Sequence, residues 1–271
     1  MIHFQNARRV SRITTGILIA LLFVIPILYV VMISFEAPQH FILHPLQPSS
    51  PAAGNYSQAY QQGDLGLQLL NTVLYSVSAA AISTFLSVLI AFPVARSLVR
   101  WSSTIYRSFV IGICLPLAVI PLFVEARDLH LYDNRIGYII LHVEPGLPLG
   151  VLLIAAFIAS VPKELDEAAW LDGCSYLRYI VQFVIRLAWP SIVITFLYSL
   201  LQVWNDIIGP VIFLASPNLL PVTRGIYNFY GQNQSAWTLL AAAVVIVSLP
   251  VFALFAASQR QLLRSVVGGS V

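Results

Sequence analysis

Charged residues are scarce in this chain of 271 residues. Asp, Glu, Lys and Arg together make up 9% of it, whereas about a quarter of the residues of a typical soluble protein are charged. Apolar residues make up 59%, and the mean hydropathy is +0.85. So few charged groups cannot cover the surface of a water-soluble protein of this size. The composition therefore excludes a soluble globular protein and predicts that lipid is the main solvent of the chain.

Motifs for several kinds of chemistry are also missing. There is no G-x-x-x-x-G-K-[ST] run to hold ATP phosphates and no H-E-x-x-H run. The two cysteines, Cys114 and Cys174, lie on opposite sides of a predicted span boundary, so we expect neither a zinc site nor a disulfide. No G-x-S-x-G elbow occurs, and His142 has no evident Ser and Asp companions. The basic residues form no cluster, which argues against nucleic acid as a partner. We expect no catalytic residue, metal or bound cofactor in this chain.

Long apolar runs are what the sequence contains instead. About 20 apolar residues cross a bilayer as a helix, and a transmembrane barrel is excluded because its strands alternate in polarity. The first run is too long for the core of a signal peptide and no A-x-A site follows it, so we interpret it as an uncleaved span. The sequence predicts one all-α polytopic membrane domain over residues 13–257 with six transmembrane helices. The six stretches are residues 13–34, 69–95, 108–125, 136–160, 188–212 and 236–257.

The arrangement of basic residues predicts the orientation of these spans. Cytoplasmic segments of membrane proteins carry an excess of Lys and Arg. With residues 1–12 and the tail 258–271 in the cytoplasm, eleven of the 14 basic residues lie on the cytoplasmic side. We therefore expect both termini inside, an extracytoplasmic loop at 36–67 and a long cytoplasmic loop at 161–187. The three remaining basic residues are Arg127, Arg135 and Arg224.

The cytoplasmic loop 161–187 has the pattern of a helix–turn–helix. Pro162 suits the first turn of a helix, and the acidic residues that follow favour the positive end of its dipole. Gly173 allows the chain to reverse, and Ser175 can cap a second helix that runs from Tyr176 towards Ile185. A solvated connector is the alternative interpretation. Against it, the apolar side chains in the first helix would stay exposed unless a partner protein covered them.

Several motifs resemble those of one transporter family. The stretch Glu167-Ala168-Ala169-Trp170-Leu171-Asp172-Gly173 resembles the EAA-x-x-x-G signature of permease subunits of bacterial ABC importers. Within that group the chain is most similar to the binding-protein-dependent sugar permeases, in particular the smaller maltose-permease-like subunit, over approximately residues 65–271. The further matching elements are Asn71-Thr72, Trp204-Asn205-Asp206 through Pro210, the last apolar stretch from Trp237 to Gln259-Arg260, and Gly268-Gly269.

The resemblance implies a type I ABC importer permease-like fold and a transport function without covalent chemistry. The chain would form half of a translocation pathway for carbohydrates in the bacterial inner membrane. Its implied partners are a second homologous permease, two ATPase subunits that bind ATP and Mg²⁺, an extracytoplasmic solute-binding protein, and membrane lipid. The implied contact with the ATPase is a coupling helix that comprises Glu167, Ala168, Ala169, Leu171, Asp172 and Gly173.

One position departs from the family pattern. The family signature continues with I-x-L-P about ten residues after the glycine, and here Arg186 stands in the place of that proline, with Pro190 four residues later. We therefore expect the second helix of the loop to continue further before it breaks.

Polar residues at membrane depth are candidates for the transport pathway, because placing ionisable groups in lipid is costly. Glu144 lies beside Pro145, Gly146 and Pro148, so we expect an interrupted helix with Glu144 either at the pathway or satisfying freed backbone groups. Polar residues of the fifth stretch can either recognise sugar or hold a bent helix; they are Gln202, Trp204, Asn205 and Asp206. Residues of the loop before the last stretch belong to the expected outer gate or binding-protein contact; they are Tyr227, Tyr230 and Gln232.

Other functions stay open on the sequence. A polyol or a glycerophosphodiester is the nearest alternative cargo. An ion-coupled secondary transporter would use an intramembrane carboxylate such as Glu144 or Asp206. An intramembrane enzyme would need a nucleophile, for which the sequence offers no candidate.

Overall fold

The computed structural model describes residues 2–45, 47, 51–229 and 236–268, and all regular structure in these ranges is helical. The longer helices are joined by short 3₁₀ turns (η1, η3 and η4) and one π-helical segment (η2). In chain order the elements are α1 (Ile2–Ser34), α2 (Pro38–Leu43), α3 (Gly54–Gln62), α4 (Leu65–Ala95), α5 (Ser102–Cys114), α6 (Val119–Asp128), α7 (Arg135–Leu141), η1 (Glu144–Gly146), α8 (Leu147–Ser160), α9 (Glu164–Leu171), α10 (Tyr176–Tyr179), η2 (Ile180–Val184), α11 (Ile185–Leu187), α12 (Trp189–Trp204), α13 (Ile208–Phe213), η3 (Pro217–Leu219), α14 (Val222–Ile226), η4 (Tyr227–Phe229) and α15 (Trp237–Gly268).

The helices long and apolar enough to cross a membrane agree with the predicted fold class. Four such segments occur in the described residues, and two further segments are bent helix pairs. Counting each bent pair as one span gives six, the number expected from the apolar runs. The four segments are Ile13–Ser34, Leu65–Ala95, Arg135–Ser160 and Trp237–Gln259.

Two of the predicted stretches are not straight helices. In 108–125, α5 and α6 meet at 109°, because Pro116 has no N–H to continue a helix and holds Leu115 in an extended conformation. The prediction of one helix over 188–212 is also wrong. The helix α12 ends at Trp204, and α13 begins only at Ile208. The bent pair is instead Ile180–Leu187 with Trp189–Trp204, at 80°.

The chain divides into two compact units. Unit 1 comprises Met1–Gly66 with Gly225–Val251, and unit 2 comprises Leu67–Arg224 with Phe252–Val271. In unit 1, polar contacts hold the end of α1 against α3. The Ser34 hydroxyl hydrogen-bonds the Tyr56 hydroxyl at 2.7 Å, and the Asn55 amide donates to the backbone carbonyls of Ser34 and Glu36.

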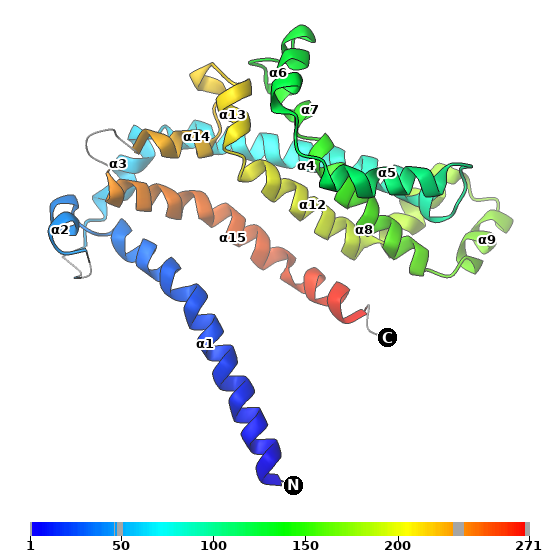
Figure 1. Cartoon of the computed structure of the whole chain (residues 1–271), viewed down its shortest axis with the longest axis horizontal. Helices are drawn as coiled ribbons and strands as arrows, with labels where there is room; N and C mark the ends of the chain where they lie inside the picture. The colour runs from blue at the N-terminus through cyan, green and yellow to red at the C-terminus, as the bar shows by residue number, and fades with distance from the viewer. Residues whose placement is uncertain (1, 46, 48–50, 230–235, 269–271) are drawn as a thin grey trace. The chain divides into compact units, whose positions relative to one another are not determined.

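Small residues allow three helices of unit 2 to approach closely. The pairs Ser83 and Ser87 on α4, Gly146 and Gly150 at η1 and α8, and Thr195 and Ser199 on α12 are each four residues apart. A Cβ atom on Gly146 would lie 2.5 Å from the hydroxyls of both Ser83 and Ser199. Small residues spaced by four are the means by which helices pack in lipid, where the hydrophobic effect does not draw helices together. Figure 1 shows α8 beside α5 and α12 in this unit.

Candidate functional site

The helix α9 is the first half of the predicted docking loop. It begins at Glu164, two residues after Pro162, and its first turn carries Glu164, Asp166 and Glu167. These carboxylates lie at the positive end of the helix dipole, which stabilises the short helix. The helix–turn–helix expected from the sequence is present, since α10, η2 and α11 follow over 176–187.

A glycine in the left-handed conformation ends α9. Gly173 has φ +70°, a region that residues with a Cβ rarely adopt. The Gly173 N–H donates to the Trp170 carbonyl at 3.0 Å, and the Cys174 N–H donates to the Ala169 carbonyl at 3.0 Å. These two bonds form a Schellman motif, which closes the helix and turns the chain.

Most of α9 is exposed. Glu167, Ala168 and Trp170 lie at the surface of unit 2, and Leu171 is 89% exposed. Asp172 and Gly173 are exposed as well. Ala169, which the sequence assigned to the docking surface, is only 8% exposed and packs into the core of its own chain. The available surface is therefore a small, partly apolar face that carries the carboxylates of Glu167 and Asp172.

The second helix of the loop continues past the position where the family has proline. The segments α10, η2 and α11 run from Tyr176 to Leu187, with Arg186 exposed inside the last of them. The bend follows at Ala188, two residues before Pro190, which lies in the first turn of α12. The expectation that the helix extends further is confirmed, and Pro190 supplies the break.

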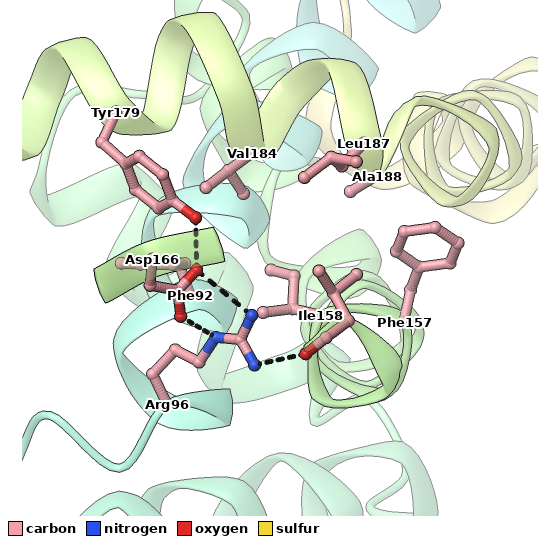
Figure 2. A pocket seen from close by; sticks show the side chains of 10 residues that line it. Phe92, Arg96, Phe157, Ile158, Asp166, Tyr179, Val184, Leu187 and Ala188 are labelled. Atoms are coloured by element: carbon pink, nitrogen blue, oxygen red, sulfur yellow. Dashed lines mark hydrogen bonds and ion pairs between the residues drawn. The ribbon is translucent and has the colours of Figure 1, made fainter. Parts of the chain in front are cut away.

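A buried ion pair that is not among the residues predicted from the sequence holds the inner side of α9. The Arg96 Nε lies 2.6 Å from Asp166 Oδ2, and the Tyr179 hydroxyl donates to Asp166 Oδ1 (Figure 2). Burial, together with this hydrogen bond, raises the pKa of the Tyr179 hydroxyl, so it stays a donor. The available signal was the spacing of Asp166 and Ala169 by three residues, which places both on one face of the helix.

A second polar cluster joins residues that the sequence treated separately. Asp206 Oδ2 accepts a hydrogen bond from the Tyr138 hydroxyl at 2.9 Å and lies 2.7 Å from His142 Nε2. Asp206 Oδ1 accepts from the Gly209 N–H at 3.0 Å. The expectation that His142 lacks an aspartate companion is therefore wrong, because the turn after α12 brings Asp206 to the end of α7. The Asp206 carboxylate already has hydrogen-bond partners within its own chain, which favours the interpretation that it holds a bent helix.

The other pathway candidates differ in exposure. Gln202 and Asn205 are exposed, but Trp204 is buried, which leaves its ring no open face for a sugar. Glu144 is exposed in η1, where the helix is interrupted as predicted. It shares with Glu125 a groove of about 340 Å³, otherwise lined by apolar side chains.

Of the three outer-gate candidates, the structure describes one. Tyr227 lies in η4 in unit 1 and is exposed. Tyr230 and Gln232 lie outside the described residues.

Replacing Asp206 with alanine is expected to destabilise unit 2 strongly. It removes the acceptor of the Tyr138 hydroxyl, the His142 ring and the Gly209 N–H, and each buried donor left unsatisfied costs about 1–3 kcal/mol. Thermal unfolding of the protein in detergent measures this loss. Asn205→Ala is the matched control, since among the described residues the exposed Asn205 side chain hydrogen-bonds only to the Leu201 carbonyl. Equal melting temperatures for Asp206→Ala and Asn205→Ala would contradict the expected role of the cluster.

The chain is similar to known transport proteins. The family described as "binding-protein-dependent transport system inner membrane component" matches residues 83–266. The osmoprotective compounds uptake permease protein GgtD of Synechocystis sp. is 30% identical over 236 residues, which cover 84% of this chain and 78% of GgtD. The diacetylchitobiose uptake system permease protein NgcG of Streptomyces coelicolor is 27% identical over 98% of this chain and 90% of its own length. A chain of a bacterial ABC transporter that imports the acidic polysaccharide alginate has the same fold, with a TM-score of 0.82 at 20% identity over 93% of this chain and 96% of that one.

Proposed function

Because the chain belongs to the family of binding-protein-dependent transport system inner membrane components, we propose that it is one of two homologous permease chains in an ATP-driven importer of carbohydrates. The observation that carries the proposal is the family match over residues 83–266, which includes the exposed helix α9. The chain is a multi-pass transport subunit, and ATP and Mg²⁺ are bound by two separate ATPase subunits. A solute-binding protein delivers the cargo from outside the cell.

The proposed contact with the ATPase is the exposed face of α9 and the turn after it. Glu167, Ala168, Leu171, Asp172 and Gly173 form this face, while Ala169 supports it from the core. Leu165, Trp170 and Leu171 are all exposed on this short helix, and exposed apolar side chains that occur together suit a cleft in another protein. Docking there would let closure of the ATPase dimer displace α9.

The proposed cargo is a carbohydrate. The relatives' names support this class, since NgcG belongs to a diacetylchitobiose uptake system and the structural neighbour belongs to an importer of alginate. The name of GgtD, an osmoprotective compounds uptake permease protein, favours an osmoprotective solute as the second candidate cargo. Glu144, Gln202 and Asn205 are the exposed polar side chains proposed for the pathway.

The proposed topology places both termini in the cytoplasm of a bacterium. Residues 1–12, the loop 161–187 and the tail 258–271 lie inside, the loop 36–67 lies outside, and residues 13–257 form the membrane domain. The excess of arginine in the inner segments supports this orientation.

Reconstitution of the whole complex tests the proposal. The complex is purified from native membranes through a tag on this chain and placed in liposomes with ATP inside and the solute-binding protein outside. We expect uptake of a labelled oligosaccharide only when both ATP and the binding protein are present, with labelled polyol and glycerophosphodiester as the competing cargoes. Uptake driven by a sodium or proton gradient without ATP would instead support a secondary transporter and overturn the proposal.

A further inference from the structure

The helix α9 is fastened to the rest of unit 2 by very few side chains. Among its eight residues only Asp166 and Ala169 are buried. Alanine offers one methyl group to the core, so its contribution to holding the helix is small. Most of the attachment must therefore come from Asp166.

The partner of Asp166 ties together segments that are distant in the sequence. Arg96 directly follows the end of α4, and its guanidinium forms a fork on Asp166, with Nε 2.6 Å from Oδ2 and Nη2 3.2 Å from Oδ1. The third nitrogen, Nη1, donates to the Val161 carbonyl at the end of α8, at 2.9 Å. The Tyr179 hydroxyl from α10 completes the shell of the carboxylate. Figure 2 shows these three side chains converging between the helix ends.

The surroundings make this connection rigid. The side chains of Arg96 and Asp166 are 5% and 9% exposed, so water does not screen the pair. The space among Phe92, Phe157, Val184 and their neighbours amounts to about 10 Å³, roughly the least that holds one water molecule. Breaking a buried pair by removing one partner strands the other charge, which is strongly unfavourable.

The turn after α9 makes no comparable contact with the end of a span. Gly173 has φ +70°, and apart from its chain neighbours nothing lies within 4 Å of the position that a Cβ atom would take. The two hydrogen bonds of this turn run back to the Trp170 and Ala169 carbonyls of α9 itself. A push on α9 is therefore passed to the ends of the spans by Asp166 and not by this turn.

We propose that Arg96, Asp166 and Tyr179 form a clamp that makes α9 move as one body with the ends of α4 and α8. Arg96 and Tyr179 are positioning residues in this view, since they act through Asp166 and touch neither cargo nor nucleotide. When α9 is displaced, the clamp moves the ends of α4 and α8 together with it. This step rests on the proposed contact between α9 and an ATPase.

Two measurements on the complex in its natural assembly test the clamp. The first is the uptake of oligosaccharide per ATP hydrolysed in liposomes. We expect Arg96→Met to lower this ratio about tenfold while ATP hydrolysis continues, which corresponds to about 1.4 kcal/mol. Arg96→Lys should recover part of the ratio, because it restores the charge without the fork. Tyr179→Phe should lower the ratio less, and it keeps the test decisive if Arg96→Met does not accumulate.

The second measurement needs no ATPase activity. In a chain whose two free cysteines are replaced (Cys114→Ser and Cys174→Ser), a spin label at Glu164→Cys, on the exposed side of α9, should become more mobile in Arg96→Met and Tyr179→Phe than with the clamp intact. The matched controls are Glu164→Gln for uptake and Arg178→Gln for both readouts, since each removes an exposed charge from the same loop.

The outcomes separate the two proposals. If the unaltered complex shows no ATP-driven uptake, the proposed function fails, and the spin label alone decides the clamp. If the unaltered complex couples normally and the Arg96 and Tyr179 variants keep its uptake per ATP and label mobility, the clamp is overturned and the proposed function stands.

Discussion

A chain carrying Gly173→Pro is expected to reach the membrane in normal amounts and to lose nearly all ATP-driven uptake. Proline fixes φ near −65° and has no N–H, whereas Gly173 has φ +70° and donates to the Trp170 carbonyl. The substitution therefore destroys the turn that closes α9 and sets its exit direction. Because the glycine is exposed with open space around it, the damage should stay local and spare the packed spans.

ATP-driven uptake by a Glu167→Lys variant tests the docking face on α9. Glu167→Lys reverses the charge of an exposed carboxylate on the docking face. A cation in the first turn of α9 also opposes the helix dipole, at a cost of about 0.3–1 kcal/mol, but the buried contacts of Asp166 and Ala169 are unchanged. We expect continued ATP hydrolysis with uptake reduced to background. The readouts are transport and hydrolysis by the reconstituted complex at matched protein levels. Gly173→Ala provides a graded control, since it strains the backbone by about 1 kcal/mol and keeps the N–H. Wild-type uptake by both Gly173→Pro and Glu167→Lys would refute the assignment of the coupling surface.

Substitution of Gly150 is expected to produce the largest loss of stability. A Cβ atom at this position would lie 2.7 Å from the Thr195 methyl group and would also collide with the Ser87 hydroxyl. Thr195 and Ser87 are fully buried, so neither can move aside. Overpacking a dense core typically costs about 1–3 kcal/mol, and Gly150→Leu should exceed this range and prevent accumulation of folded protein.

The milder variant Gly150→Ala measures how much stability is lost when a Cβ atom is added between these helices. Its melting temperature in detergent should fall clearly below that of the unaltered chain, while Gly112→Ala should melt normally. The control lies on α5 against the same helix, where an added Cβ would meet Pro148 at an ordinary 3.5 Å. Combining Gly150→Ala with Ser87→Ala and Thr195→Ser removes the colliding atoms and should restore part of the loss. No difference between Gly150→Ala and Gly112→Ala would show that the three helices do not pack as closely as the structure indicates.

Local features of the chain could be read from the sequence because their causes are local. Composition alone identified lipid as the solvent, since burial in lipid needs only apolar side chains. Gly173 ended a helix where expected, and the interruption at Glu144 followed from the prolines beside it. Pro116 predicts a break in kind within the stretch 108–125, which counts as one span when the bent pair is taken together. Hydrophobicity does not reveal a bend of 109° within a continuous apolar run.

The roles of individual polar residues depended on contacts between distant segments. Arg96 counted in the sequence only as a positive charge on the cytoplasmic side, and it is the buried partner of Asp166, 70 positions away. Asp206 was a candidate for the pathway, and it is bound to His142 from another helix, 64 positions away. Trp204 is a candidate for stacking on a sugar in the sequence, and in the structure its side chain is buried.

The sequence by itself determined the solvent, the apolar spans and the family of this protein. These follow from side-chain polarity, backbone preference and short motifs, which act over a few residues. Only the tertiary structure decided which carboxylates are free and which serve the fold. A carboxylate becomes structural when another helix brings a donor within about 3 Å, and no local pattern specifies which helix that is.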